Sequence, residues 1–320
     1  TFCHLFSWKA VFSETYGHHS YYLAAISDSG EWQGVLPLVQ VKSHLFGNAL
    51  FSLPFVNYGG LICKNNAAGE TLLNAATELC SALGASYVEL RHTEKIWPGL
   101  HTRHHKVSMV LKMASEVDAQ WRAFDTKLRN QIRKAEKSGL GSAEGHLDLL
   151  DGFYEVLARN MRDLGSPIHS KIFFRRILEE FPQSTRVLVV SIDGKIIAAG
   201  LVCWFGETIE IPWASSLREY NSLCPNNLLY WNAIRLAIGR GIRTFDFGRS
   251  TPNEGTFNFK KQWGAVPMQL NWQYAYGANQ IAPGAGSQGR MFQVAAAIWR
   301  KLPVAVTKVI GPGIRKYNRK

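Results

Sequence analysis

The sequence predicts an α/β (α+β) fold, with mixed sheets flanked by helices, arranged as two tandem domains. The chain has 320 residues, of which 46% are apolar and 12% aromatic, enough to form two hydrophobic cores. The order hairpin, strand, helix, strand occurs twice along it. Two pairs of segments also match: 27–38 matches 191–202, and 83–91 matches 239–249. These matches favour a duplicated unit; the alternative is one irregular α/β domain.

The first domain is expected to span residues 1–113. Asp28, Ser29 and Gly30 lie between two apolar runs, which predicts a hairpin turn. Apolar residues recur at helical spacing from 67 to 83, and Gly84 then ends that helix. The expected elements are a helix at 8–16, strands at 20–27 and 35–41, a helix at 67–83, and strands at 87–91 and 107–112.

The second domain is expected to span residues 114–277. Its first helix, at 115–138, is the most strongly patterned in the chain, with apolar residues on one face and basic residues on the other. Asp193 and Gly194 predict the turn of a second hairpin. The remaining expected elements are helices at 148–163, 170–180 and 226–239, and strands at 186–192, 196–205, 208–213, 244–247 and 269–276.

The net charge of +12 is concentrated in two segments. Residues 290–320 contain eight Lys or Arg and no acid, and residues 122–137 contain six bases and two acids, so the rest of the chain is neutral. Such patches attract polyanions, such as a nucleotide diphosphate, a nucleic acid or an anionic membrane surface. The chain has no DNA-reading motif and its aromatic residues are spaced like core residues, so DNA is not an expected partner.

The C-terminal segments are expected to lie outside the two domains. Residues 278–289 are rich in Gly, Pro and Ser, which predicts a flexible linker. Residues 290–320 follow as a basic amphipathic tail, with a helix limited by Pro303 and a stop at 311–313. Its apolar stripe and its bases predict peripheral contact with the anionic inner face of the cytoplasmic membrane. The alternative is that the same apolar residues pack back on the second domain.

A cytoplasmic location is expected for the chain. Its five cysteines are odd in number, lie far apart and include no CxxC pair, as in a reduced compartment. No stretch approaches the roughly 20 apolar residues that span a bilayer, and no signal-peptide pattern occurs. No metal is expected, because His101, His104 and His105 have no carboxylate or Cys partner nearby.

Residues 208–250 contain the helix and strand that an acyl-CoA-binding domain would use. The turn SLREYNSLCPNN (216–227) precedes the helix, whose N-terminal N–H groups could bind a pyrophosphate. Pro225 and Asn226 can start and cap that helix. The turn lacks the glycines that let a backbone wrap a diphosphate closely, which disfavours CoA as the donor without excluding it.

Four segments together resemble the FemAB family of transferases, within the GNAT superfamily. They are WRAFDTKLRNQIRKAEKSGL (121–140), DFGRS (246–250), GTFNFKKQWGA (255–265) and SHLFGNALFSLPFVNYGG (43–60), the last taken with the strand YVELR. The segment at 43–60 is most similar to FemAB-related proteins associated with exosortase and exopolysaccharide loci. The resemblance covers nearly the whole chain and implies two tandem GNAT-like domains.

The resemblance implies a transferase that moves an acyl or aminoacyl group to an amine of a peptidoglycan or exopolysaccharide precursor. The best-known members use aminoacyl-tRNA and a UDP-linked muropeptide. The implied partners are a nucleotide- or lipid-linked glycan precursor and a donor, aminoacyl-tRNA or acyl-CoA, with no tightly bound cofactor. Two alternatives stay open: an acetyl- or acyl-CoA-dependent GNAT N-acyltransferase on an amino sugar, and a non-catalytic, membrane-associated module on a decayed transferase scaffold.

The resemblance also implies the position of the site. Phe259 and Lys260 match the Phe-Lys pair at the transfer centre of FemAB enzymes. Attack of an amine on an ester builds an oxyanion, which the ammonium group of Lys260 can stabilise. The alternatives are that Lys260 solvates a turn and that Phe259 only packs.

Other candidates come from spacing and position. Arg129 and Arg133 lie one helical turn apart, where two guanidinium groups can bind one phosphate, unless the basic face is only solvated. Asp246 and Arg249 lie at the exit of the strand at 244–247, and Glu89 and Arg91 lie at the equivalent place in the first domain. Each pair is either a substrate contact or a structural salt bridge. The candidate substrate-binding residues are Arg129, Arg133, Asn57, Tyr58, Arg91, Asp246 and Arg249.

Overall fold

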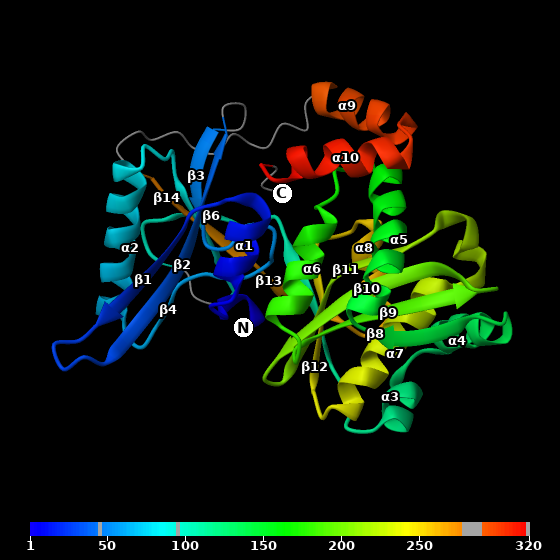
Figure 1. Ribbon diagram of the computed structural model, residues 1–320. Coiled ribbons are helices and arrows are strands. Elements are labelled where there is room, and N and C mark those ends of the chain that lie inside the picture. Colours follow the sequence, from blue (N-terminus) through cyan, green and yellow to red (C-terminus); the bar gives the residue numbers. More distant parts are fainter. Residues whose placement is uncertain (44–46, 94–96, 277–289, 318–320) are drawn as a thin grey trace.

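Two mixed sheets of seven strands each, flanked by helices, make up the computed structural model (Figure 1). The structure describes residues 1–43, 47–93, 97–276 and 290–317. The strand order is β1-β2-β3-β5-β14-β6 in the first sheet, where β4 also pairs with β2, and β13-β7-β12-β11-β10-β9-β8 in the second. The predicted fold class, with two tandem units, is confirmed.

The first half of the chain supplies most of the first sheet. Helix α2 covers one face of this sheet, and Leu36, Leu72 and Leu90 belong to the buried cluster beneath it. The elements are α1 (Trp8–Tyr16), β1 (Ser20–Ile26), β2 (Trp32–Ser43), β3 (Gly47–Phe51), β4 (Ile62–Cys63), α2 (Asn66–Ala82), β5 (Val88–His92) and β6 (His101–Arg103).

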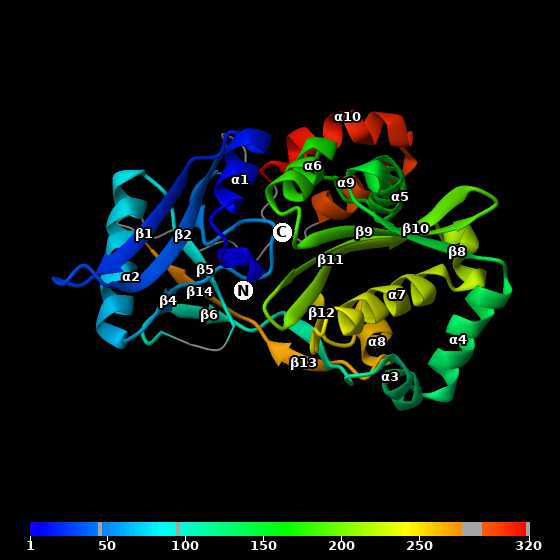
Figure 2. The same ribbon diagram turned by 60° about the horizontal axis from the view of Figure 1, so that its bottom comes forward.

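The rest of the chain forms the second sheet and its helices. Helices α5, α6, α9 and α10 lie on one side of this sheet, and α3, α4, α7 and α8 on the other (Figure 2). The elements are β7 (Val107–Lys112), α3 (Val117–Ala123), α4 (Thr126–Lys137), β8 (Gly141–Gly145), α5 (Leu150–Asp163), α6 (Lys171–Glu180), β9 (Thr185–Ile192), β10 (Lys195–Phe205), β11 (Thr208–Ser216), α7 (Pro225–Gly239), β12 (Thr244–Ser250), α8 (Gly255–Lys261), β13 (Val266–Gln269), β14 (Asn271–Ala275), α9 (Arg290–Lys301) and α10 (Val304–Arg315).

The two halves repeat the same unit. In the first, the hairpin β1–β2 is followed by β3, α2 and β5, and in the second the hairpin β9–β10 is followed by β11, α7 and β12. In both units the third and fourth strands pair in parallel, β3 with β5 and β11 with β12. The repeat suggested by the two sequence matches is therefore present in the fold.

The sheets do not follow the expected boundary at residue 113. Strand β7, which the sequence placed at the end of the first domain, pairs with β12 and β13 in the second sheet. Strand β14, which it placed in the second domain, pairs with β5 and β6 in the first. The halves thus exchange their closing strands. Sheet membership depends on long-range pairing, and no local pattern reports it.

The predicted helix at 115–138 is two helices, α3 and α4. Phe124 between them has extended backbone, and Asp125 is the N-cap of α4, with its side chain accepting a hydrogen bond from the backbone N–H of Leu128 at 2.6 Å. A strong N-cap residue inside an apolar pattern begins a new helix. Gly139 has φ +76° after α4, as expected for a residue that ends a helix.

The tail is folded on the second half. Helix α10 continues through 311–313 to Arg315, so the predicted stop there is wrong. Gly311 lies against Ile168, and a Cβ on Gly311 would come within 3.3 Å of it, so this glycine serves close packing. Trp299 is buried, and the side chain of Arg162 donates to the carbonyl of Leu302 at 3.0 Å. The predicted linker at 278–289 lies outside the described residues.

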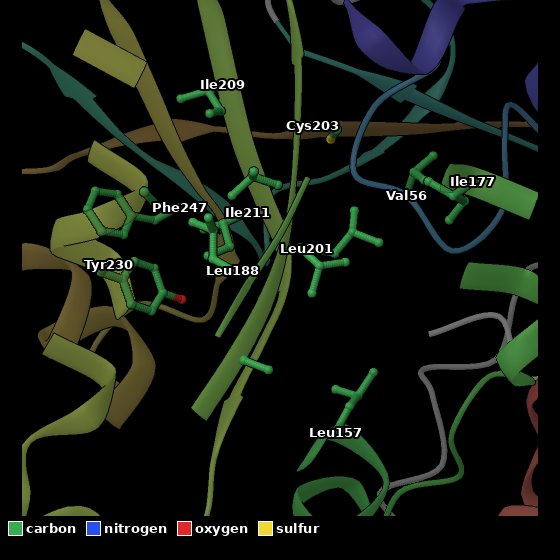
Figure 3. Close-up of a cluster of buried hydrophobic side chains, with 14 of the residues drawn as sticks. Val56, Leu157, Ile177, Leu188, Leu201, Cys203, Ile209, Ile211, Tyr230 and Phe247 are labelled. Atoms are coloured by element: carbon green, nitrogen blue, oxygen red, sulfur yellow. The ribbon is translucent and has the colours of Figure 1, made fainter. Parts of the chain in front are cut away.

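One continuous core joins the two halves. Val56, from a loop of the first half, belongs to the same buried cluster as Leu201, Ile211 and Phe247 of the second sheet. Figure 3 shows part of this cluster, with Val56 and Ile177 on one side and Tyr230 and Phe247 on the other. The loop at 52–60 is therefore fixed against the second half.

Candidate functional site

A pocket of about 240 Å³ lies where β11 and β12 separate. The two strands pair in parallel only up to Glu210 and Asp246, and beyond that point residues of both strands border the pocket. The other walls come from the first half, from α5, β10 and α8, and from the end of α10. The lining residues are Phe2, Cys3, Trp8, Phe55, Val56, Asn57, Met161, Cys203, Glu210, Pro212, Trp213, Phe247, Gly248, Arg249, Lys260 and Arg315.

Lys260 lies in this pocket, 8% exposed, at the end of α8. Its Nζ donates to the carbonyl oxygens of Gly248 at 2.9 Å and Arg249 at 3.0 Å. Burial lowers the pKa of Lys260 to about 8. Lys261, by contrast, is exposed. The ammonium of Lys260 therefore faces the pocket while two carbonyls fix its position, which differs from a lysine that solvates a turn.

The backbone around Gly248 makes this arrangement possible. The pairing of β12 with β7 shifts register between Asp246 and Arg249, which marks a β-bulge. Gly248 has φ +75° inside the bulge, a conformation that side chains with a Cβ rarely adopt. The bulge turns the carbonyls of Gly248 and Arg249 toward Lys260.

Asp246 is buried and accepts three hydrogen bonds. The donors are the hydroxyl of Tyr58, the hydroxyl of Ser108 at 2.5 Å and the backbone N–H of Gly248 at 2.7 Å. Burial raises the pKa of Asp246, and the three donors offset part of that shift. Asp246 was predicted to bind substrate. In the structure its carboxyl group is fixed beside the pocket and does not line it.

Glu210 is the acidic residue that the sequence analysis missed. It is buried, lines the pocket, and lies opposite Asp246 in the register of β11 and β12. Burial raises the pKa of Glu210 well above its usual range, and the neighbouring Asp246 adds to the shift. Because three donors stabilise the charged form of Asp246, Glu210 is the member of the pair whose protonated form is favoured. The sequence feature that could have revealed Glu210 is a single acid inside the otherwise apolar run TIEIP (208–212).

The two acid–Arg pairs differ. Glu89 and Arg91 form a buried ion pair, with Oε1 of Glu89 at 2.9 Å from Nε and 2.8 Å from Nη2 of Arg91. Arg249 lines the pocket with its guanidinium 5.3 Å from the ring centre of Trp272, and it forms no ion pair with a described residue. The predicted substrate role thus fits Arg249, whereas Arg91 is structural.

The loop at 52–60 brings the first half to the site. Asn57 lines the pocket, and Tyr58 is buried against Asp246 as described above. Leu53 and Phe55 have φ of +61° and +71°, which is unfavourable for residues with a Cβ. The surrounding core holds this loop in a strained conformation at the pocket.

Three predicted residues lie away from the pocket. Phe259 packs on Tyr230 with ring centres 5.1 Å apart and does not line the pocket, in agreement with a packing role. Arg129 and Arg133 are on α4, which contacts α7, and neither lines the pocket; Arg133 lies over Trp121. The structure does not bring these two arginines to Lys260.

The N-terminus of α7 lies beside α4. Pro225 occupies its first turn as predicted, but the N-cap is Cys224, with φ +57°, instead of Asn226. Nδ2 of Asn227 donates to Oε1 of Gln131 on α4 at 3.1 Å. Within the described residues, no group of three His, Cys, Asp or Glu side chains is placed to hold a metal ion, and no helix is long and apolar enough to cross a membrane.

Comparisons with known proteins give a domain match in the second half. A family model described as an acetyltransferase (GNAT) domain matches residues 122–261. No match is found among curated proteins.

Solved structures give the fold of the whole chain. FemX is similar over 87% of this chain and 92% of its own, with a TM-score of 0.69 and 16% identity. The C-terminal domain of a putative lysylphosphatidylglycerol synthetase from Agrobacterium fabrum is similar over 94% of this chain and 91% of its own, with a TM-score of 0.58 and 12% identity. A tandem GNAT protein from the clavulanic acid biosynthesis pathway is similar over 81% of this chain and 83% of its own, with a TM-score of 0.55 and 12% identity. Residues 122–261 therefore match a GNAT acetyltransferase domain, which indicates acyltransferase activity, and the whole chain has a tandem GNAT fold like that of FemX.

Proposed function

We propose that this chain is a FemAB-type transferase that moves an acyl or aminoacyl group to an amine of a peptidoglycan or exopolysaccharide precursor. The observation that supports this most directly is the position of Lys260. Its ammonium is held by the carbonyls of the β12 bulge inside a pocket that also contains Glu210. The pocket thus combines a fixed cation with a protonated carboxyl group, the two kinds of group that acyl transfer to an amine can use.

The residues account for each part of the transfer. As the amine nitrogen attacks the acyl carbon, a C–N bond forms and the carbonyl oxygen becomes an oxyanion, which Lys260 stabilises. Glu210, protonated in the resting pocket, donates its proton to the leaving oxygen or sulfur as the C–O or C–S bond breaks, and its carboxylate then takes the amine proton, which restores the starting state.

The donor in this proposal is aminoacyl-tRNA or acyl-CoA, and the acceptor is a nucleotide- or lipid-linked glycan precursor. Similarity to FemX and to a synthetase named for lysylphosphatidylglycerol, an aminoacylated lipid, supports an aminoacyl donor and a lipid-linked acceptor. The separation of β11 from β12 ahead of α7 supports the alternative, an acyl-CoA-dependent N-acyltransferase on an amino sugar.

The place of action in this proposal is the cytoplasm, at the inner face of the membrane. Helices α9 and α10 each expose apolar side chains beside basic ones, although Trp299 is buried. On α10, Val309 is 79% exposed. An exposed apolar stripe with bases favours shallow, reversible contact with anionic lipid.

A transfer assay with two donors and two acceptors tests the function. Aminoacyl-tRNA and acyl-CoA would each be incubated with a UDP-linked muropeptide and with an amino sugar, and products detected by mass. We expect one combination to give a product, and Lys260→Ala to lower its rate by about 100-fold or more.

Lys261→Ala, a change in the exposed neighbour, should leave the rate unchanged. Because Lys260 also holds two carbonyls, Lys260→Ala should lower the free energy of unfolding by about 1–3 kcal/mol, so both variants need a melting curve. If a folded Lys260→Ala protein works at the wild-type rate, Lys260 is not in the transfer centre. If the folded wild type gives no product with any combination, the non-catalytic alternative gains.

A further inference from the structure

Arg315 comes from the C-terminal helix pair but lines the same pocket as Lys260 and Arg249. In the sequence, Arg315 belongs to the basic tail at 290–320, for which contact with the membrane is expected. In the fold, α10 passes α5 and ends at Arg315, which is only partly exposed. The backbone carbonyl of the next residue, Lys316, accepts a hydrogen bond from Nε2 of His18 at 3.0 Å, which fixes the end of the helix.

A neutral histidine orients Arg315. Nε of Arg315 donates to Nε2 of His169 at 3.0 Å. Because Nε2 accepts, Nδ1 of His169 carries the ring proton and donates to the hydroxyl oxygen of Tyr16. The ring of His169 stacks on Phe173 with centroids 4.4 Å apart, and Tyr154 donates to its backbone carbonyl at 3.1 Å. Burial lowers the pKa of His169 well below its usual range, and the charge of Arg315 adds to the shift.

A neutral partner leaves the charge of Arg315 uncompensated. Within the described residues, Arg315, Arg249 and Lys260 form no ion pair with a carboxylate, in contrast to Arg91, which is paired with Glu89. Burial lowers the pKa of Arg249 to about 9 and that of Arg315 to about 10, so both stay charged at neutral pH. Buried cations that form no described ion pair and share one pocket favour the binding of an anion there.

We propose that Arg315 is a substrate-binding residue that, together with Arg249, binds a carboxylate or phosphate group of the acceptor. This deepens the proposed function, on which it rests for the identity of the ligand as acceptor. The guanidinium nitrogens that His169 does not use can bind two oxygens of one anion. Binding the anion there holds the acceptor amine near Lys260 and Glu210. The helix pair α9–α10 is then part of the binding site, not only a membrane contact.

Direct binding of simple anions tests this. Isothermal titration would measure the affinity of full-length protein for inorganic phosphate and, separately, for the dipeptide alanyl-alanine, which carries a free carboxylate. We expect Arg315→Gln to weaken binding of one of them by about tenfold or more, the scale for losing a charge-assisted contact. Arg300→Gln removes an equal charge from an exposed site on α9 and should change neither affinity by more than about twofold.

The two probes distinguish the sources of the anion. If Arg315→Gln weakens only the binding of phosphate, the anion bound by Arg315 is the phosphate of a nucleotide- or lipid-linked precursor. If it weakens only the binding of the dipeptide, the anion is a peptide carboxylate. Equal affinities in Arg315→Gln and Arg300→Gln, or no binding of either anion to the wild type, would overturn the proposal.

Two controls keep this result separate from folding and from the transfer assay. If Arg315→Gln fails to fold, Arg315→Lys decides, because it keeps the charge but loses the forked donors, and we expect about threefold to tenfold weaker binding. Wild-type affinity in a folded Arg315→Lys protein would then contradict the proposal. The titration contains no acyl donor, so it does not depend on whether transfer occurs.

Discussion

The two halves of the chain place different residues at the same point of the repeated unit. In the first half, β3 and β5 pair in parallel through Phe51 and Glu89, and in the second, β11 and β12 pair through Glu210 and Asp246. A phenylalanine thus occupies the position equivalent to Glu210. Only the second half has two carboxyl groups where its parallel strands meet.

The arginines that follow also differ. In the first half, Arg91 binds Glu89, and Tyr274 donates to the other carboxylate oxygen at 3.1 Å, so the charges are compensated. In the second, the bulge at Gly248 separates Asp246 from Arg249, which faces the pocket. One extra residue in a strand therefore distinguishes a structural ion pair from a candidate site. The first half instead supplies the loop with Asn57 and Tyr58.

The largest effect that this comparison predicts is on catalysis. Glu210→Gln should lower the rate of transfer by about 10²–10⁴-fold, the range for losing a proton-transferring group, while the melting temperature changes little, because an amide replaces a protonated carboxyl group. Glu89→Gln in the first half should lower the melting temperature and keep the transfer rate. The reverse pattern, activity lost in Glu89→Gln and kept in Glu210→Gln, would move the site to the first half.

The next effect is on stability. Arg91→Ala should lower the free energy of unfolding by about 3–5 kcal/mol, because it leaves the buried carboxylate of Glu89 without its partner. Arg249→Ala should lower it by less than about 1 kcal/mol, because only the contact with Trp272 is lost. Urea unfolding of both variants measures the difference. Similar losses in the two variants would mean that both arginines are structural.

A pH dependence distinguishes Lys260 from the other lysines. Its pKa is lowered to about 8, so the charged form, and with it the transfer rate, should fall by about tenfold per pH unit above pH 8. Stability should change in the opposite direction: between pH 8 and 10.5 the unfolded chain binds more protons at this residue, so its contribution to the free energy of unfolding rises with pH. Comparison of wild type with Lys260→Ala isolates both effects. If the difference in free energy of unfolding between the two proteins does not change from pH 8 to 10.5, the pKa of Lys260 is not lowered by folding.

Much of the fold could be predicted because it follows from local patterns. The hairpin at Asp193 and Gly194, the helix at 67–83 and the strand at 107–112 are where the sequence places them. The exchange of β7 and β14 could not be predicted, because both strands have ordinary strand patterns and only their long-range partners differ.

The site was predicted in part for the same reason. Lys260 and Asp246 lie in motifs that the sequence displays, and both form a hydrogen bond with the backbone of Gly248 in the bulge. Glu210 was missed because a single acid in a strand carries no motif, and Arg315 because its role depends on α10 packing across α5. Arg129 and Arg133 were expected to bind substrate from their charge and their spacing of one helical turn, neither of which reports where that face of the helix lies in the fold.

The smallest expected effect concerns the helix pair α9–α10, which follows the repeated unit of the second half. Full-length protein should sediment with anionic vesicles at low salt and not with neutral ones, and added salt should release it. Val309→Glu should weaken the binding by about threefold to tenfold, because it puts a negative charge into the exposed apolar stripe of α10.

Trp32→Glu is the matched control, since Trp32 is 61% exposed in the hairpin of the first half, away from α10. If Trp32→Glu instead releases the protein from vesicles, the first half faces the membrane. If neither variant changes sedimentation, or if the wild type does not sediment, then α9 and α10 do not bind the membrane. Their roles would then be packing and the placement of Arg315. Binding through α10 would connect membrane contact with the pocket, because the same helix exposes Val309 to solvent and ends at Arg315.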